Sequence, residues 1–336
     1  MFDPSAVAEK NGNYFGFPYS TKEAEILLLG VPWDVTTSYR DGAVNGPEAI
    51  LEASTQLDFV SPFRKEAWKT RIGTFSTPKK WKQTSKRLRK IAKEHISRLE
   101  SGKKPKSIDS LNKESAKFHR EVYEEVKRAL SQAPVITIGG DHSISHGPIL
   151  AYQEKYPDLC VLHIDAHADL RVNYEGFPHS HASIMNLVEA FPQVKKIVQV
   201  GIRDYAPMEW EKIQSSKKIH TFFDWEIQKQ KLEGSSWKTI TKQIVSQLGQ
   251  NVYLSFDVDG LDPQFCPNTG TPVAGGLNIQ EVYFLLDELV KSGKKLVGAD
   301  LVEVAPDPKG LSDWDANVGA RLIFQIAQFI QNSQTK

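Results

Sequence analysis

The sequence predicts a three-layer α/β protein in which helices cover both faces of a mostly parallel central sheet. Short apolar runs rich in β-branched residues alternate with amphipathic helical patterns along most of the 336 residues. This alternation is typical of strand–helix units that build a parallel sheet. Several of the runs are almost wholly apolar, as expected of strands that are covered on both faces.

Seven segments are expected to be strands: residues 26–31, 135–138, 159–164, 196–200, 218–222, 252–256 and 295–301. Helical stripes, with apolar residues every three to four positions, lie between them or follow them. One stripe precedes the second strand and another ends the chain; they consist of Phe118, Val122, Val126 and Leu130, and of Val318, Leu322, Ile326 and Ile330.

A basic segment at about residues 62–107 interrupts this pattern, and we interpret it as an insertion within a single domain spanning 1–336. Sixteen Lys or Arg face three Glu between Arg64 and Lys106. Residues 82–100 are expected to form an amphipathic helix packed through Leu88, Ile91 and Leu99, with its charges in solvent. Two alternatives are a position at the mouth of a binding site, where the segment would favour acidic ligands, or at a subunit interface.

Composition excludes several classes of protein. With 40% hydrophobic and 25% charged residues, the chain is neither disordered nor fibrous. A net charge of +1 selects neither nucleic acid nor membrane as a partner, and no apolar run is long enough to span a bilayer. Two cysteines support neither a disulfide framework nor a Cys-rich zinc site. Without a secretory signal at the start of the sequence, a cytoplasmic location is expected.

Three polar clusters follow predicted strands, where open α/β sheets bind ligands. The first is Gly139-Gly140-Asp141-His142-Ser143, in which two glycines are expected to let the chain turn sharply and leave His142 at the rim. Taken alone, His142 would more often be a structural residue.

The second cluster runs from His163 to Asp169. In an extended chain Asp165, His167 and Asp169 point to the same side, separated by two alanines. Three such groups at the end of an apolar strand are costly to bury without a cation. His163 is expected to be a hydrogen-bonded core histidine.

The third cluster contains Asp257 and Asp259, which again share a face and precede Gly260 and Pro263. Alone they would be a turn or capping pair. The three clusters together supply four carboxylates and two imidazoles, a set that suits Mn²⁺ or another borderline divalent ion. Six ligands fit two ions, and a two-metal site makes a nucleophile from water near neutral pH. The residues therefore indicate a binuclear metallohydrolase.

These motifs resemble the ureohydrolase family, which includes arginases and agmatinases and cleaves urea from guanidino compounds. Further similar stretches are Gly30-Val-Pro-Trp-Asp34 with Gly46-Pro-Glu-Ala, Gly270-Thr-Pro-Val-Ala-Gly-Gly276 and Val302-Glu303-Val-Ala-Pro306. The resemblance covers nearly the whole chain outside about 60–115 and implies the arginase/deacetylase-like fold. It also implies assembly into trimers or hexamers.

By resemblance, two Mn²⁺ ions per subunit are implied, although the ligand set also accepts Co²⁺ or Ni²⁺. One ion would be bound by His142, Asp165, Asp169 and Asp257. The other would be bound by Asp165, His167, Asp257 and Asp259. Asp165 and Asp257 would therefore bridge the two ions.

The resemblance also assigns roles in catalysis. Glu303 would hold the planar guanidinium, which a carboxylate can bind in a bidentate manner. His181, with His179 as the alternative, would protonate the leaving amine after attack by a metal-activated water. Asp169 is counted with these catalytic residues.

Substrate choice depends on the branch of the family. Arginases have Asn and Ser where this chain has Arg171 and Phe177, so arginine is disfavoured, and several segments look like agmatinase. Arg171, Glu175 and Asp204 are candidate substrate contacts, although pairing of Arg171 with Glu175 is favoured over a role for Glu175 with a ligand amine. Arg203 and Asp204 would line the pocket rim or form a surface pair.

The expected reaction is therefore hydrolysis of agmatine to putrescine and urea. A guanidino-acid hydrolase, acting on guanidinobutyrate or guanidinopropionate, is the alternative within the family, with another guanidine hydrolase or arginase below it. From other classes we consider a zinc-dependent amine deacetylase and a non-catalytic binding protein on the same fold.

Overall fold

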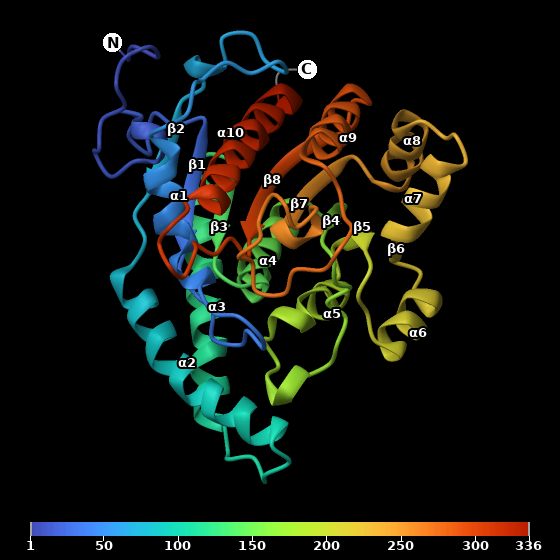
Figure 1. Cartoon of the computed structure of the whole chain (residues 1–336). Coiled ribbons are helices and arrows are strands. Elements are labelled where there is room, and N and C mark those ends of the chain that lie inside the picture. Colours follow the sequence, from blue (N-terminus) through green and yellow to red (C-terminus); the bar gives the residue numbers. More distant parts are fainter. Residues whose placement is uncertain (1, 335–336) are drawn as a thin grey trace.

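The computed structural model describes residues 2–334, whose eight strands form one all-parallel sheet (Figure 1). The strand order is β2-β1-β3-β8-β7-β4-β5-β6. The strands are β1 Ile26–Val31, β2 Ile72–Phe75, β3 Val135–Gly139, β4 Leu159–Ile164, β5 Val194–Ile202, β6 Ile219–Phe223, β7 Asn251–Asp257 and β8 Lys295–Val302.

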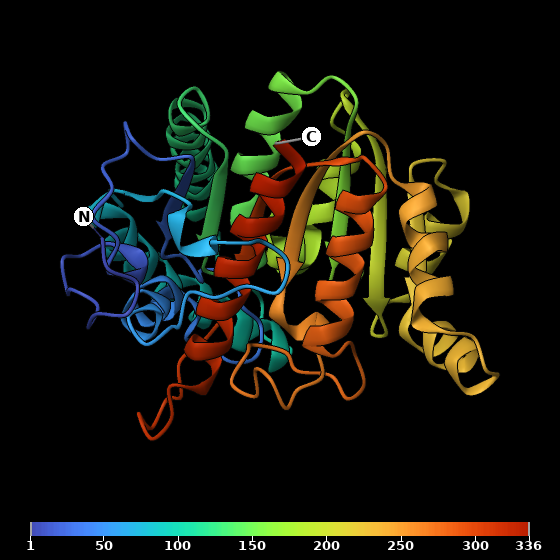
Figure 2. The same ribbon diagram turned by 90° about the horizontal axis from the view of Figure 1, so that it is seen from above.

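Helices cover the sheet on both faces, as Figure 2 shows from above. The α-helices are α1 Gly46–Ser54, α2 Lys79–Glu100, α3 Asp109–Leu130, α4 His146–Lys155, α5 Ile184–Glu189, α6 Pro207–Ser215, α7 Asp224–Leu232, α8 Trp237–Gln247, α9 Ile279–Lys291 and α10 Trp314–Gln334. Helices α1, α7, α8, α9 and α10 contribute to one hydrophobic core, and α2 to α6 to the other. The predicted three-layer α/β architecture is confirmed.

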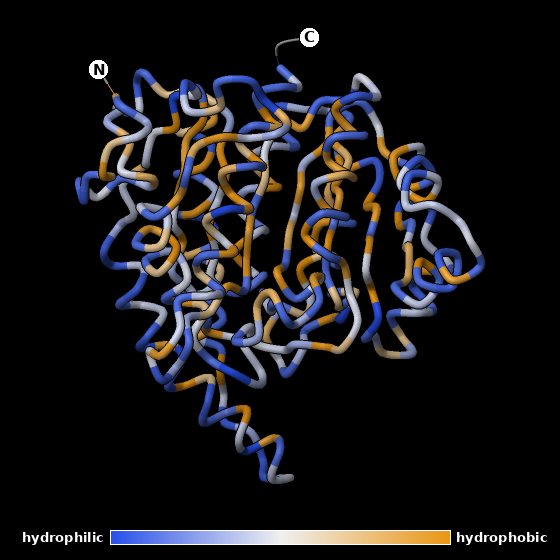
Figure 3. The backbone as a smooth tube through the Cα atoms, turned by 45° about the horizontal axis from the view of Figure 1, so that its top comes forward, coloured by the Kyte–Doolittle hydropathy of each residue, from blue (hydrophilic) through white to orange (hydrophobic). Residues whose placement is uncertain are grey.

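The seven predicted strands are all present. The residues of β1, β3 and β4 are all buried because helices cover both faces, whereas the interior of the edge strand β6 is only half-buried. Figure 3 shows the hydrophobic residues concentrated along these strands. The two predicted helical stripes lie on α3 and α10, and every one of their eight residues is buried.

One strand was not predicted: β2, within the basic segment. Its four residues, Ile72-Gly73-Thr74-Phe75, are too few and too mixed to show a strand pattern. Its conformation comes from pairing with β1, where Ile72 lies opposite Ile26. The edge of the central sheet is therefore built from the segment expected to be an insertion.

Helix α2 follows β2 and packs against α3, and the hairpin that they form projects from the rest of the molecule (Figure 1). The expected packing through Ile91 and Leu99 is wrong, because these side chains are 43% and 37% exposed. The buried face instead contains Trp81, Leu88, Ala92 and Ile96, and Trp81 stacks edge-on against Phe118 of α3.

Most basic side chains of α2 are neutralised locally. Glu121 and Glu114 on α3 pair with Lys80 and Arg87, and Asp41 pairs with both Arg89 and Lys93. Acidic residues of neighbouring elements therefore compensate part of the positive charge of this segment. Within residues 2–334, none of the helices is long and apolar enough to cross a membrane.

Candidate metal centre

The three clusters predicted from the sequence meet at the carboxyl ends of four neighbouring strands. His142 follows β3, Asp165 to Asp169 follow β4, Asp257 and Asp259 lie at the end of β7, and Glu303 follows β8. These strands are consecutive in the sheet, in the order β3-β8-β7-β4, although they are distant in sequence. Strand order therefore brings the clusters together.

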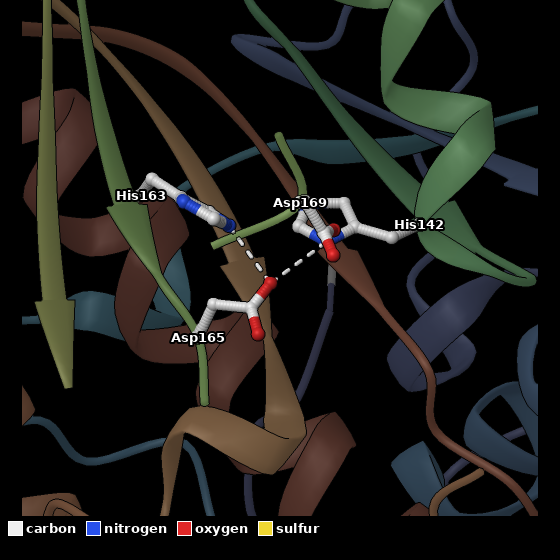
Figure 4. A group of neighbouring side chains, drawn as sticks. All are labelled: His142, His163, Asp165 and Asp169. Atoms are coloured by element: carbon white, nitrogen blue, oxygen red, sulfur yellow. Dashed lines mark hydrogen bonds and ion pairs between the residues drawn. The ribbon is translucent and has the colours of Figure 1, made fainter. Parts of the chain in front are cut away.

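The first group of ligating atoms surrounds Nδ1 of His142. This nitrogen lies 3.0 Å from Asp165 Oδ2, 3.0 Å from Asp169 Oδ2 and 3.4 Å from Asp257 Oδ2. Figure 4 shows Asp165 and Asp169 directed toward the His142 ring. All four side chains are buried, so a cation at this point would be held in a water-poor environment.

Hydrogen bonding leaves Nδ1 of His142 as a free ligand. Ser255 Oγ donates to Asp300 Oδ1 at 2.9 Å, and its lone pair faces Nε2 of His142 at 2.9 Å. The ring proton is therefore placed on Nε2, and Nδ1, which is buried and has no hydrogen-bond partner among the described residues, is directed at three carboxylates. This arrangement fits a metal-ligating histidine whose other nitrogen is oriented by a second partner.

The second group lies on the other side of Asp165. Nδ1 of His167 is 3.5 Å from Asp165 Oδ1 and 3.1 Å from Asp259 Oδ2. The two oxygens of Asp165 thus face different groups, as a bridging carboxylate would. Asp257 contacts the first group through Oδ2, and its Oδ1 accepts the N–H of Asp259, a ligand of the second group.

His163 also contacts Asp165, but as a hydrogen-bond donor. Thr221 donates to Gln199 Oε1, which directs the Gln199 amide N–H to Nδ1 of His163. The ring proton then lies on Nε2, which donates to Asp165 Oδ2 over 2.8 Å (Figure 4). The expectation of a hydrogen-bonded core histidine agrees with this geometry.

The shifted pKa values in the cluster indicate an excess of buried negative charge. Burial, together with the neighbouring Asp165, raises the pKa of Asp169 to about 7, and burial with Asp259 and Asp165 raises the pKa of Asp257 well above its usual range. Although burial alone would lower it, the carboxylates of Asp165 and Asp169 hold the pKa of His142 well above its ordinary value, so that without a cation Nδ1 attracts a proton, which a bound metal ion would replace. Divalent cations would neutralise this group of negative charges.

The backbone at the site differs from the expected extended strand. Strand β4 ends at Ile164, and Asp169 has a positive φ of 55°; β7 ends at Asp257, and Asp259 lies in a 3₁₀ turn. The predicted sharing of one strand face is therefore wrong, and the side chains converge because the loops curve. Strained φ angles of this kind are found where a site constrains the chain.

The glycines before His142 lie where the chain turns. The backbone bends at Gly140, directly after β3, as predicted, but neither Gly139 nor Gly140 has a positive φ. Gly140 is required because a Cβ there would lie 2.1 Å from the carbonyl oxygen of Trp33. The close approach allows Asp141 N–H to donate to that oxygen over 2.7 Å.

Glu303 lies beside the first group of ligands. It has a positive φ of 62°, is 5% exposed, and accepts the backbone N–H of His142 at Oε1 over 3.0 Å. Its Oε2 is buried and has no partner among the described residues. Burial and the nearby Asp141 raise the pKa of Glu303 well above its usual range, which a cationic ligand would reverse.

Of the two candidate proton-transfer histidines, the structure places His181 at the site and His179 outside it. His181 lines a cavity of about 150 Å³ together with His167 and Asp169. Burial and the neighbouring His167 lower its pKa to about 3. His179 instead packs its ring 4.8 Å from that of His119 and 5.0 Å from that of His146.

Two of the three candidate substrate contacts line this cavity, Arg171 and Asp204. The favoured pairing of Arg171 with Glu175 is wrong: Arg171 Nε lies 3.6 Å from Glu209 Oε2, and its guanidinium lies over the Tyr174 ring. Asn173 and Glu175 have positive φ, so this stretch is not a helix that could bring positions four apart together.

Glu175 lies away from the cavity, where its carbonyl oxygen contacts His95 Nε2 on α2 at 2.9 Å. Arg203 is not a surface partner of Asp204, because its guanidinium donates to the carbonyl oxygens of Gly201, Asp259 and Val273. Asp204 itself lies at the rim, with Oδ2 3.9 Å from His167 Nε2 and a side chain that is 68% exposed.

Several residues of the site could not be recognised in the sequence. The cavity is also lined by Ser38, Tyr174, Glu209 and Thr271, and Ser255 and Asp300 orient His142. These residue types are common in loops and strands. Their only sequence signal is proximity to the predicted clusters, as with Ser255, which lies two residues before Asp257.

Comparison with known proteins agrees with the geometry of the site. Residues 24–328 match the model of the Arginase family. The chain is 34% identical to an N(1)-aminopropylagmatine ureohydrolase of Thermus thermophilus over 298 residues, which covers 86% of this chain and 85% of that protein. It is 31% identical to the agmatinase of Bacillus subtilis, with 91% of each chain covered.

Among solved structures, a hypothetical agmatinase from Burkholderia thailandensis superposes with a TM-score of 0.75. The alignment covers 99% of this chain and 94% of that one at 24% identity, and it shows a shared fold.

Proposed function

Because this chain belongs to the arginase family, we propose that it hydrolyses a guanidino compound to urea and an amine, as one ureohydrolase domain. The observation that carries the proposal is the pair of ligand groups that share Asp165. Each group combines carboxylates with an imidazole whose Nδ1 faces them.

The residues present fit two divalent ions. His142, Asp165, Asp169 and Asp257 would hold one, and Asp165, His167, Asp257 and Asp259 the other. Two ions held there would supply a nucleophile derived from water near neutral pH. Manganese is the proposed metal, because mixed imidazole and carboxylate ligands suit it.

The chain's own residues would position and protonate the substrate. The free Oε2 of Glu303 would accept an N–H of the guanidinium, while its Oε1 stays bound to the backbone of His142. His181, in the cavity wall, would take a proton released by the attacking water and pass it to the nitrogen of the departing amine. Burial of the Glu303 carboxylate strengthens its attraction for a cation.

Agmatine is the proposed substrate, and the charges around the cavity support it. Arg171 already faces Glu209, while the carboxylate of Asp204 is exposed at the rim and could receive a distal ammonium group. Arg89 of α2, whose charge acts on His181, is paired with Asp41 and so does not favour an acid.

A guanidino acid is the second candidate, and one observation favours it. The side chain of Arg171 is 38% exposed and its contact with Glu209 is a 3.6 Å ion pair, so the guanidinium could turn to a substrate carboxylate. Arg171→Gln would then lower kcat/KM for guanidinobutyrate and spare that for agmatine.

The test is urea release after loading with Mn²⁺, Ni²⁺ or Co²⁺, measured with agmatine, arginine, guanidinobutyrate, guanidinopropionate and guanidine. We expect agmatine to give the highest kcat/KM. Asp257→Ala and His167→Ala should abolish urea release while the circular dichroism spectrum is kept, and the surface variant Asp158→Asn should behave as the wild type. Full activity in Asp257→Ala and His167→Ala would refute the two-metal proposal.

A further inference from the structure

We infer that Thr36, with Asp141 behind it, is a positioning residue that fixes the ring proton of His181 on Nδ1 and leaves Nε2 to exchange a proton with the substrate. This inference rests on the proposed role of His181. Thr36 lies in the loop that follows β1, 145 residues away in sequence.

The three side chains form a chain of contacts that leads from the half-buried His181 to the buried Thr36 and Asp141. The backbone N–H of His181 donates to Thr36 Oγ1 over 3.1 Å, and the same oxygen lies 3.3 Å from Nδ1 of the His181 ring. Asp141 Oδ2 accepts both the N–H and the hydroxyl of Thr36, each over 3.4 Å. Thr36 is 1% exposed and Asp141 is fully buried, so water does not compete for these groups.

The number of protons on the Thr36 hydroxyl determines which of its hydrogen bonds to Asp141 and His181 it donates. The Thr36 hydroxyl has a single proton and two lone pairs. If it donated to His181 Nδ1, its lone pair would face the Asp141 carboxylate with no proton between the two oxygens. Donation to the carboxylate is the stronger, charge-assisted bond. The Thr36 oxygen is then an acceptor toward Nδ1, so Nδ1 carries the ring proton.

Asp141 is itself fixed as an acceptor. Its Oδ1 accepts the N–H of Ser143 over 3.1 Å and also the Ser143 hydroxyl. Asp141 Oδ2 is therefore free to accept from Thr36, and the Thr36 hydroxyl proton points toward this oxygen.

A second hydroxyl lies near the same nitrogen. Ser180 Oγ is 3.4 Å from Nδ1 of His181 and accepts the N–H of Ala182. No carboxylate fixes the direction of its proton, so it can accept from Nδ1 or donate to it. We therefore expect the Ser180 hydroxyl to accept from Nδ1 or donate to it according to the His181 tautomer that Thr36 sets.

Helix α2 holds Thr36 in place. Ser85 Oγ accepts the N–H of Asp34 over 3.1 Å, and Arg89 donates to the carbonyl oxygen of Val35 over 3.1 Å. The two residues before Thr36 are thus anchored to the basic helix. This explains how a segment outside the cavity contributes to the geometry of the proton-transfer residue.

The adjacent threonine supplies a matched control. Thr37 is 3% exposed, but its hydroxyl donates to the carbonyl oxygen of Asp34, and within residues 2–334 it forms no hydrogen bond with His181. Thr36→Val and Thr37→Val thus remove the same group from neighbouring buried positions.

The experiment compares wild type, Thr36→Val, Thr36→Ser, Thr37→Val and Ser180→Ala. Kinetics with the best guanidino substrate are combined with ¹⁵N NMR of the histidine rings in enzyme loaded with diamagnetic Zn²⁺, with His181→Gln used for assignment. We expect Thr36→Val to move the His181 proton away from Nδ1 and to lower kcat by at least about tenfold with KM nearly unchanged. A ring whose proton lies on Nε2 has no lone pair there to take up the proton released by the attacking water, and so cannot pass that proton to the departing amine. Thr36→Ser should restore both properties, and Thr37→Val and Ser180→Ala should keep the wild-type tautomer.

An Nδ1–H tautomer that persists in Thr36→Val, or a kcat loss in that variant that is matched by Thr37→Val, would overturn the inference. Failure of the proposed function gives a different result. In that case His181→Gln would keep full urea release, or no guanidino substrate would react, while the NMR comparison would still report on Thr36.

Discussion

At the scale of the residue, three histidines near the site differ in role because of what their second nitrogen contacts. His142 has its proton directed to Ser255, which leaves Nδ1 as a ligand, whereas His163 receives a hydrogen bond at Nδ1 and donates from Nε2. His181 faces Thr36. A histidine's neighbours therefore decide whether it binds a metal, supports a ligand or transfers a proton.

The hydroxyl of Ser255 should matter for metal affinity. Removing it in Ser255→Ala leaves the buried Nε2–H of His142 without an acceptor and permits the ring to turn or change tautomer. We expect divalent-metal affinity to fall about 10- to 100-fold, measured by competition with a metallochromic chelator. Ser246→Ala, on the exposed face of α8, is the control, and equal affinities in the two variants would contradict the assignment.

Sequence reasoning found the ligating residues because their types and spacing are unusual. The Asp165-x-His167-x-Asp169 pattern and the Asp257-x-Asp259 pair each indicate metal ligands in a stretch of only a few residues. Ser255 and Thr36 could not be found, because their roles depend on partners 113 and 145 residues away.

At the scale of the element, β2 and α2 form one unit that ties the basic segment to the active-site loops. Strand β2 pairs with β1, and α2 then contacts the loop after β1 through Ser85 and Arg89. His95 reaches the carbonyl oxygen of Glu175 in the loop after β4. The polar side chains of this helix therefore hold two neighbouring loops, in addition to its ion pairs with α1 and α3.

Arg89 is the buried link in this arrangement. Its side chain is 10% exposed, pairs with Asp41 at 2.6 Å and donates to Val35. We expect Arg89→Met to lower the free energy of unfolding by about 2 kcal/mol, because a charged hydrogen bond and a buried carbonyl lose their partner. Arg87→Met removes an exposed pair with Glu114 from the same helix and should cost less than about 1 kcal/mol. Urea denaturation measures both, and equal losses would refute the role of Arg89.

A second feature at this scale is the histidine cluster that joins α3, the start of α4 and the loop before His181. His119, His146 and His179 pack their rings within 4.8 to 6.0 Å of one another. Burial lowers the pKa of His146 to about 4 and that of His119 well below its ordinary value. These rings are therefore neutral in the folded protein at neutral pH.

The cluster should make stability depend on pH. Because the folded-state pKa values lie below the unfolded value of about 6.5, the stabilisation is complete above pH 6.5 and is lost as the pH falls toward 4. From pH 7 to 5, His146 alone should cost about 2 kcal/mol. His146→Phe, which keeps the ring packing against Phe191, should reduce the loss seen in urea denaturation by that amount. The same pH dependence in wild type and variant would contradict this expectation.

At the scale of the whole molecule, the order of the strands assembles the site. The clusters follow β3, β4, β7 and β8, which are scattered over about half of the chain but are neighbours in the sheet. The resulting group of buried carboxylates repels itself unless cations are bound.

Metal binding should therefore stabilise the whole fold. A ligand at 100 times its Kd that binds only the folded state adds about 2.7 kcal/mol per site. We expect Tm to rise when Mn²⁺ is added to chelator-treated protein, measured by differential scanning calorimetry. Asp257→Ala should lose most of this increase, and an equal rise in that variant would show that the ions bind elsewhere.

Local sequence patterns predict the α/β class, seven of the eight strands and the residue types of the metal centre, because hydrophobic periodicity and dense motifs are properties of neighbouring residues. The strand order, the inclusion of β2, the pairing of Arg171 with Glu209 and the partners of each histidine became visible only in the folded chain. These features depend on contacts between residues far apart in the chain. The energies of such contacts cannot be inferred from a pattern of neighbouring residues.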